Sequence, residues 1–343
     1  MRHPMINARE IRLLPRSGLE LTALGLGCSQ LGGLYRPISW GDSEALVDAA
    51  WSAGLRYFDT APYYGYTLSE RRVGQALAAR ERDTFVLSTK VGRLMSPDAG
   101  VRPGDDGWAA PLPFRPVYDY SYAGIMRSYE DSLQRLGMAR IDILYVHDIG
   151  AMTHGERHVR YWAQLTEGGG FRALAQLRES GAVRAIGLGV NEWEIVVDAM
   201  NEMPLDVVLL AGRYTLLEQT ALEPLLDACV RAETAVVVGG VFNSGVLAGN
   251  GKFNYGDAPA NVIEKVQRLT DLSNRFDVPL PAAALQFPFA HPAVVSCVVG
   301  ARSVAQLQQN LAWLERPIPD AYWQALCRDG LVAANAPVPK GQT

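Results

Sequence analysis

The stretch LRYFDTAPYYG, residues 55–65, decides the fold, because a short apolar run ends there in a carboxylate, Asp59, and leads into an aromatic turn. Two later apolar runs also end in a polar residue, TFVLSTK at residues 84–90 and IDILYVH at residues 141–147. Near-continuous apolar strands are typical of parallel sheets that are covered on both faces. Because a closed β/α barrel places its active site where its parallel strands end, the pattern predicts one site at that face.

The polar residues at these strand ends have complementary chemistry: Asp59, Tyr64, Lys90 and His147. A nearby cation lowers the pKa of a tyrosine from about 10 toward the range of a general acid or base. Lys90 is expected to be that cation, held by Asp59, and His147 is expected to hydrogen-bond the reacting oxygen. Taken singly, each residue also has a structural explanation. Their joint position, without a G-x-S-x-G nucleophile motif, favours hydride transfer with a dissociable cofactor.

Strands and helices alternate along the rest of the chain. A β-hairpin is expected at residues 11–21, and eight strands at 24–27, 55–59, 84–90, 141–147, 184–189, 207–210, 235–239 and 294–299. Helices are expected at 42–54, 69–79, 121–137, 157–180, 192–203, 218–232, 261–276, 282–289, 303–314 and 320–330, with Asp42, Ser69 and Ser121 as N-caps. Eight strand–helix units predict an α/β fold, a (β/α)8 TIM barrel that forms a single domain over residues 1–343.

Two segments depart from this alternation. Residues 93–119 are rich in Gly, Pro and Asp, follow the third strand and are expected to be a long structureless loop on the catalytic face. Aromatic residues within the loop, such as Trp108, favour a wall of the substrate or cofactor site. Residues 331–343 are expected to form a C-terminal tail.

Composition excludes several classes of function. The chain has 343 residues, is 48% hydrophobic and carries a net charge of −4. It has no basic run of the kind that binds nucleic acid, and no apolar stretch of the roughly 20 residues that a membrane helix needs. The four scattered cysteines favour a reduced, cytoplasmic protein, and no spacing of Cys and His predicts a metal site.

Six segments resemble the aldo-keto reductase family: FDTAPYYG at 58–65, STK at 88–90, RLG at 135–137, RID at 140–142, YVH at 145–147 and GARS at 300–303. The resemblance covers nearly the whole chain. It implies a barrel that binds a nicotinamide cofactor without a G-x-G-x-x-G motif. It also implies Tyr64 as the acid/base, Lys90 and Asp59 as the pair that tunes it, and His147 as the residue that orients the carbonyl.

The same resemblance implies cofactor contacts from Asn191, Phe242, Asn243, Ser244, Gly245, Gly300, Arg302, Ser303, Gln306, Gln309 and Asn310. Ala211 and Gly239 stand where the family usually has a glutamine and an aromatic residue, so Phe242 is expected to supply the apolar face for the nicotinamide. Gly300 and Gln306 stand where many relatives have basic residues that bind the 2′-phosphate of NADP. NAD is therefore the expected cofactor, with NADP as the alternative.

Residues 189–193, 242–245 and 330–339 resemble the branch of the family that holds D-threo-aldose 1-dehydrogenase, L-fucose dehydrogenase and pyridoxal 4-dehydrogenase. This implies oxidation of an aldose such as L-fucose at C1 to the lactone. Pyridoxal oxidation and general aldehyde or ketone reduction are the alternatives. Sugar contacts are expected from Trp40, Tyr63, Asp148 and Arg213.

Two functions of other classes stay open. One is a cofactor-binding regulatory subunit that resembles the potassium-channel β subunits, which keep the four residues but mainly bind a partner. The other is a lyase or isomerase with a Schiff base at Lys90, which is disfavoured because pairing with Asp59 keeps Lys90 protonated. The expected partner is a small sugar, aldehyde or alcohol, and the oligomeric state stays open.

Overall fold

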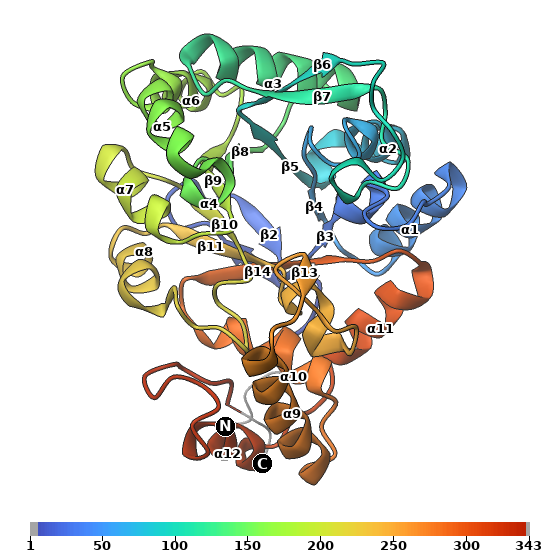
Figure 1. Ribbon diagram of the computed structural model, residues 1–343, viewed down its shortest axis with the longest axis vertical. Coiled ribbons are helices and arrows are strands. Elements are labelled where there is room, and N and C mark those ends of the chain that lie inside the picture. Colours follow the sequence, from blue (N-terminus) through green and yellow to red (C-terminus); the bar gives the residue numbers. More distant parts are fainter. Residues whose placement is uncertain (1–5, 341–343) are drawn as a thin grey trace.

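The computed structural model describes residues 6–340, and these contain a closed barrel of parallel strands surrounded by helices (Figure 1). The barrel strands are β3 (Leu24–Gly27), β4 (Tyr57–Asp59), β5 (Val86–Val91), β8 (Ile143–His147), β9 (Ala185–Val190), β10 (Val207–Ala211), β11 (Ala235–Gly239) and β14 (Val294–Gly300). Each pairs in parallel with its neighbours, and β14 closes the ring against β3. The predicted (β/α)8 TIM barrel is confirmed.

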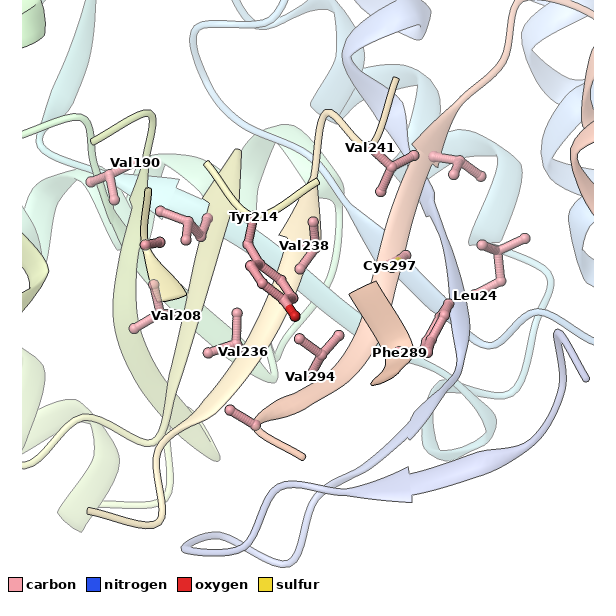
Figure 2. Packing of buried hydrophobic residues seen from close by; sticks show 14 of the residues in the cluster. Leu24, Val190, Val208, Tyr214, Val236, Val238, Val241, Phe289, Val294 and Cys297 are labelled. Atoms are coloured by element: carbon pink, nitrogen blue, oxygen red, sulfur yellow. The ribbon is translucent and has the colours of Figure 1, made fainter. Parts of the chain in front are cut away.

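Alternation along each strand divides the core into two layers. In β11, Ala235 and Val237 belong to a cluster inside the barrel, whereas Val236 and Val238 belong to the larger cluster between strands and helices (Figure 2). Successive side chains of a strand point to opposite faces. Both faces are apolar because both are buried, which explains the near-continuous hydrophobic runs in the sequence.

The predicted N-terminal hairpin is present as β1 (Ile11–Leu13) and β2 (Glu20–Thr22), which pair antiparallel. Leu14, Leu19 and Leu21 of this hairpin pack in the same inner cluster as Tyr57 and Tyr145. The hairpin therefore supplies apolar side chains to the barrel interior.

The main helices are α1 (Trp40–Ser52), α2 (Leu68–Leu77), α3 (Tyr122–Leu136), α5 (His158–Leu165), α6 (Gly170–Glu179), α7 (Glu194–Glu202), α8 (Asp227–Arg231), α9 (Ala260–Arg275), α10 (Leu280–Gln286), α11 (Val304–Leu314) and α12 (Asp320–Arg328). Figure 1 shows α9, α10 and α12 gathered at one end of the molecule. None of the helices in residues 6–340 has the length and apolar character needed to span a bilayer.

Two helices expected from the sequence are shorter than predicted. The helix expected at 157–180 is divided into α5 and α6, because three glycines at 168–170 interrupt it and Gly169 adopts a left-handed φ of 81°. The helix expected at 218–232 is reduced to a π-helical turn, η5 (Leu222–Leu226), and the short α8. Pro224 lies within that turn and has no N–H to donate to a regular helix.

Two of the three expected N-caps are wrong. Ser39 caps α1, its hydroxyl accepting from the Asp42 amide at 3.0 Å. Ser69 lies inside α2, where its hydroxyl donates to the Cys28 carbonyl instead of capping the helix. Ser121 caps α3 as predicted. The observed N-caps are Ser39 and Thr67, so the sequence placed the two caps three and two residues late, which is the usual error of boundary prediction.

The segment 93–119 is more ordered than expected. Its two arms, β6 (Arg93–Pro97) and β7 (Phe114–Tyr118), pair antiparallel, with Met95 opposite Pro116. The segment therefore projects as a β-ribbon rather than a structureless loop. A smaller hairpin, β12 (Lys252–Phe253) and β13 (Gly256–Asp257), follows the barrel strand β11.

Candidate active site

Three neighbouring barrel strands present the polar residues that the sequence singled out. Asp59 is the last residue of β4, Lys90 is the fifth of six residues in β5, and His147 is the last residue of β8. These strands are adjacent in the barrel, in the order β4, β5, β8. Tyr64 lies in the turn between β4 and α2. The structure thus brings all four residues to one end of the barrel.

Lys90 is enclosed by oxygen atoms. Its side chain is 2% exposed, and Nζ donates to Asp59 Oδ2 at 2.8 Å and to the Thr60 carbonyl at 2.9 Å. The other carboxylate oxygen of Asp59 accepts from the Ser88 hydroxyl at 2.7 Å. Lys90 Nζ also lies 4.8 Å from the centroid of the Tyr64 ring. The ammonium is therefore fixed between a carboxylate and the phenol.

This enclosure sets the protonation states of Lys90 and Tyr64. Burial by itself lowers the pKa of Lys90, but Asp59 and Tyr64 more than compensate and raise it above its ordinary value. Burial raises the pKa of Tyr64 above 10, although the Lys90 charge pulls it down. This differs from the expected lowering of the tyrosine pKa, because desolvation outweighs the nearby cation. The free centre therefore holds a cationic lysine and a protonated tyrosine at neutral pH.

His147 is held as a neutral imidazole. Burial, together with the positive charges of Arg93 and Lys90, keeps its pKa well below the ordinary 6.5. Its Nε2 lies 3.4 Å from Asp148 Oδ2, and Nδ1 has no hydrogen-bond partner within residues 6–340. The Tyr64 ring lies edge-on to the imidazole, with 6.0 Å between the ring centroids. A neutral imidazole in this position can donate one hydrogen bond and accept another.

A buried ion pair lies beside the histidine. Asp148 Oδ2 accepts from Arg93 at 2.6 Å, and Asp148 Oδ1 accepts from the Asn191 amide nitrogen at 3.0 Å. Arg93 also stacks over the Tyr63 ring, with its guanidinium carbon 4.4 Å from the ring centroid. Both oxygens of Asp148 are therefore engaged by protein donors, and the amide oxygen of Asn191 accepts from the Tyr255 hydroxyl at 3.4 Å.

Aromatic side chains surround Tyr64. Trp108, carried by the β-ribbon, lies with its ring centroid 5.7 Å from that of Tyr63 and 5.9 Å from that of Tyr64. It is 2% exposed and packs with Tyr66 and Met95. The aromatic wall expected from residues 93–119 is thus placed against the tyrosine at the strand ends.

Of the four residues expected to bind a sugar, two lie beside His147, one is bound by other protein groups and one lies away from the four central residues. Tyr63 and Asp148 lie beside His147, as described above. The Arg213 guanidinium is already bound to the Asn191 carbonyl, Glu218 and Asn254. Trp40 is exposed on α1, where its ring covers the guanidinium of Arg72 rather than any of the four central residues.

A cleft opens next to these residues, with about 240 Å³ of empty space, its solvent-facing mouth included. It is lined by Asn191, Ala211, Gly212, Gly240, Asn243, Ser244, Asn254 and Tyr255. Three expected cofactor residues are among them, and Gly245 follows in the adjoining 3-10 helix, η6 (Asn243–Ala248). Phe242 is not in the lining, because its ring packs edge-on against Trp313.

The remaining expected cofactor residues form a second group where β14 leads into α11: Gly300, Arg302, Ser303, Gln306, Gln309 and Asn310. The Ser303 hydroxyl caps α11, and the Arg302 guanidinium donates to Gln30 at 2.8 Å. Gly300 pairs with Gly27 across β14 and β3. A helix N-terminus with such a turn is suited to a phosphate group.

Both groups fit a dinucleotide. Asn310 is 1% exposed, yet its side-chain nitrogen has no hydrogen-bond partner in the described part of the chain. Gly212 and Gly240 have φ values of 71° and 61°, and a Cβ added to Gly240 would come within 3.3 Å of the Gly212 nitrogen. A bound cofactor would accept a hydrogen bond from the unpaired Asn310 amide and would pack against the bare backbone of Gly212 and Gly240.

Some residues of the site were not found from the sequence. Ser88 lies two residues before Lys90, on the same face of β5, so the strand period carried a signal for it. Arg93 pairs with a residue 55 positions away, and Tyr255 lies at the tip of a hairpin that the sequence pattern did not show. Neither had a local signal.

Comparison with known proteins agrees with this geometry. The profile of the Aldo/keto reductase family matches residues 23–328. The chain is 50% identical over 341 residues to pyridoxal 4-dehydrogenase of Microbacterium luteolum, which covers 96% of this chain and 99% of that protein. It is 41% identical over 325 residues to D-threo-aldose 1-dehydrogenase of a Pseudomonas species, covering 92% and 96% of the two chains.

Among solved structures, the holo form of an aldo-keto reductase from Bacillus halodurans has a TM-score of 0.72 and 26% identity, covering 96% of this chain and 98% of that one. Both sequence relatives belong to the branch that the motifs resemble, so the expected branch is confirmed. The chain therefore belongs to the aldo/keto reductase family and is an NAD(P)-dependent oxidoreductase.

Proposed function

We propose that the protein oxidises the hydroxyl-bearing carbon of a cyclic hemiacetal to a lactone, with Tyr64 as the general acid/base. The observation that carries the proposal is the Lys90 ammonium held between Asp59 and Tyr64. When bound, the oxidised nicotinamide accepts the hydride and adds a positive charge to the site. In the oxidation, the Tyr64 phenolate removes the hydroxyl proton while the hydrogen on carbon leaves with its electron pair as a hydride.

The other residues support this proton transfer. Lys90 stabilises the phenolate by its charge, and Asp59 keeps Lys90 protonated and in position. His147, neutral because of burial and two nearby cations, donates a hydrogen bond to the reacting oxygen, and its low pKa keeps it from competing with Tyr64 for the proton. The pairing with Asp59 also disfavours the alternative Schiff-base chemistry, which needs an unprotonated lysine.

Pyridoxal is the substrate that the geometry favours. Its hydroxymethyl group closes on its aldehyde, so it offers a flat, aromatic hemiacetal. The rings of Tyr63 and Trp108 pack beside Tyr64, and aromatic pairs of this kind add to apolar burial. The 50% identity to a pyridoxal 4-dehydrogenase supports the same choice.

An aldose such as L-fucose is the second candidate. A polyhydroxylated ring needs free polar side chains, but Asp148 and Arg213 are already bound by protein partners. The 41% identity to a D-threo-aldose 1-dehydrogenase supports an aldose as the second candidate substrate. For the cofactor we propose NAD+, with NADP+ used less well, because Gln306 is uncharged and Arg302 is engaged by Gln30.

The test is a panel of pyridoxal, L-fucose and other aldoses with NAD+ and NADP+ in parallel, followed by mass spectrometry of the product. Tyr64→Phe is expected to lower turnover at least a hundredfold, which is typical of a lost general acid or base. Tyr122→Phe, which removes a hydroxyl bonded to Gln176 on α6, is the matched control and is expected to keep full turnover. Normal turnover by Tyr64→Phe would refute the mechanism. Negligible turnover of every substrate, together with a stable complex with a membrane protein, would support the regulatory-subunit alternative.

A further inference from the structure

Among the residues that the structure describes, one aromatic side chain lines the cleft described above. Its floor is made by residues with little or no side chain, Ala211, Gly212 and Gly240, at the ends of β10 and β11. Tyr255, at the tip of the β12–β13 hairpin, is the one aromatic residue in the lining. The lining therefore combines bare backbone at the strand ends with one tyrosine.

The hairpin is tied to the site by specific contacts. The Tyr255 hydroxyl lies 3.4 Å from Asn191 Oδ1, and the Tyr255 amide donates to the Ser244 hydroxyl at 3.0 Å. Arg213 donates to Asn254 Oδ1 at 3.1 Å, and the Tyr35 hydroxyl donates to the Tyr255 carbonyl at 3.4 Å. These hydrogen bonds fix the position of Tyr255 at the cleft.

The backbone of the hairpin tip is unusual for the residue it carries. Asn254 and Tyr255 have φ values of 47° and 66°, in the left-handed region that both central residues of a tight two-residue hairpin need. Asparagine and glycine tolerate this region, whereas a bulky aromatic residue there is strained. Tyr255 is nevertheless 59% exposed, so burial of its ring in the free protein does not account for the choice.

We propose that Tyr255 forms the aromatic wall of the nicotinamide pocket and stacks on the ring that lies over Ala211, Gly212 and Gly240. Within residues 6–340, β10 and β11 end in Ala211 and Gly239, which have no large side chain, and Phe242 is turned toward Trp313. Asn191 lines the same cleft, with its amide nitrogen donating to Asp148 and its amide oxygen accepting from the Tyr255 hydroxyl. The proposal rests on the cofactor use of the proposed function, but not on the substrate.

The experiment compares the binding of NAD+ and ADP-ribose by titration calorimetry, since ADP-ribose lacks the nicotinamide. Tyr255→Gly removes the ring and creates Asn-Gly, the sequence that this type of turn prefers, so the hairpin itself is preserved. We expect its affinity for NAD+ to fall about two- to tenfold, as for the loss of one aromatic pair, while its affinity for ADP-ribose changes less than twofold. Tyr255→Phe is expected to bind both ligands like the natural protein.

The controls separate ring contact from hairpin structure. Lys252→Ala breaks the exposed ion pair with Asp257 across the hairpin and is expected to leave the ratio of the two affinities unchanged. Tyr255→Asn, which also tolerates a left-handed backbone, gives the same comparison if Tyr255→Gly does not fold. Unchanged NAD+ binding by these Tyr255 variants, or an equal loss for both ligands, would overturn the proposal. Failure of the proposed substrates would instead appear as absent turnover with the NAD+ affinity intact.

Discussion

Replacement of Lys90 by methionine is expected to destabilise the protein to an extent that depends on pH. The Lys90 ammonium lies 2.8 Å from the Asp59 carboxylate, and both side chains are almost fully buried. Methionine keeps the length of the side chain but removes the charge, so Asp59 remains as a buried carboxylate with the Ser88 hydroxyl still donating to it. At an effective dielectric constant of about 20, the lost attraction is about 6 kcal/mol.

The full loss is not observed, because Asp59 can bind a proton. With an ordinary pKa of about 3.9, protonating an aspartate costs about 4 kcal/mol at pH 7 and about 1.5 kcal/mol at pH 5. In the folded variant the pKa of Asp59 is raised above its unfolded value, so its penalty grows as the pH rises above about 4 and vanishes below it. We therefore expect a loss of about 3–4 kcal/mol in the free energy of unfolding at pH 7, and less than half of that at pH 5.

The assay is urea unfolding at both pH values, followed by circular dichroism. The double variant Asp59→Asn/Lys90→Met is the control, because it removes both charges and leaves no carboxylate to bury. It is expected to be more stable than Lys90→Met at pH 7 and to show little dependence on pH, although both variants are expected to be inactive. If Lys90→Met loses as much stability at pH 5 as at pH 7, or is as stable as the double variant, the electrostatic reasoning is wrong.

Three further predictions concern the reaction. Because burial raises the pKa of Tyr64, the rate of oxidation is expected to rise up to tenfold per pH unit above neutrality while the rate of reduction stays level, as steady-state kinetics in both directions will measure. Gly189→Ala places a Cβ 3.2 Å from Lys90 Cε, so we expect kcat to fall about tenfold at a cost of about 1–3 kcal/mol in stability, and an unchanged kcat would contradict the tight fit. Gln306→Arg is expected to improve NADP+ binding several-fold relative to NAD+ at low salt, and a preference that does not change would remove Gln306 from the phosphate site.

The barrel and its four central residues could be predicted because their signals are local. Each barrel strand is buried on both faces, so it appears in the sequence as a short apolar run. Asp59 and His147 are the last residues of such runs, and their positions along the chain fix which face of the barrel they reach. The pairing of neighbouring strands then brings them together without any further information.

The departures from prediction have physical causes that the sequence pattern does not reveal. The three glycines at 168–170 divide a segment whose apolar periodicity runs on through them. The pairing of β6 with β7 depends on contacts across more than ten residues of Gly- and Pro-rich chain. The direction of the Tyr64 pKa shift depends on how much water the fold excludes, which is a property of the assembled site.

The Arg93–Asp148 pair shows why a residue next to a predicted site residue can be misjudged. Asp148 follows His147 directly, so the sequence suggested a carboxylate free to accept hydroxyl groups of a sugar. In the folded protein Arg93 and Asn191 occupy both of its oxygens. Burial, together with the charges of Arg93 and Lys90, lowers the pKa of His147, while Asp148 offsets the charge of Arg93. Asp148 thus offsets the desolvation cost of burying a cation beside a neutral histidine. Because His147 stays neutral, Tyr64 is the group that exchanges a proton in the proposed reaction.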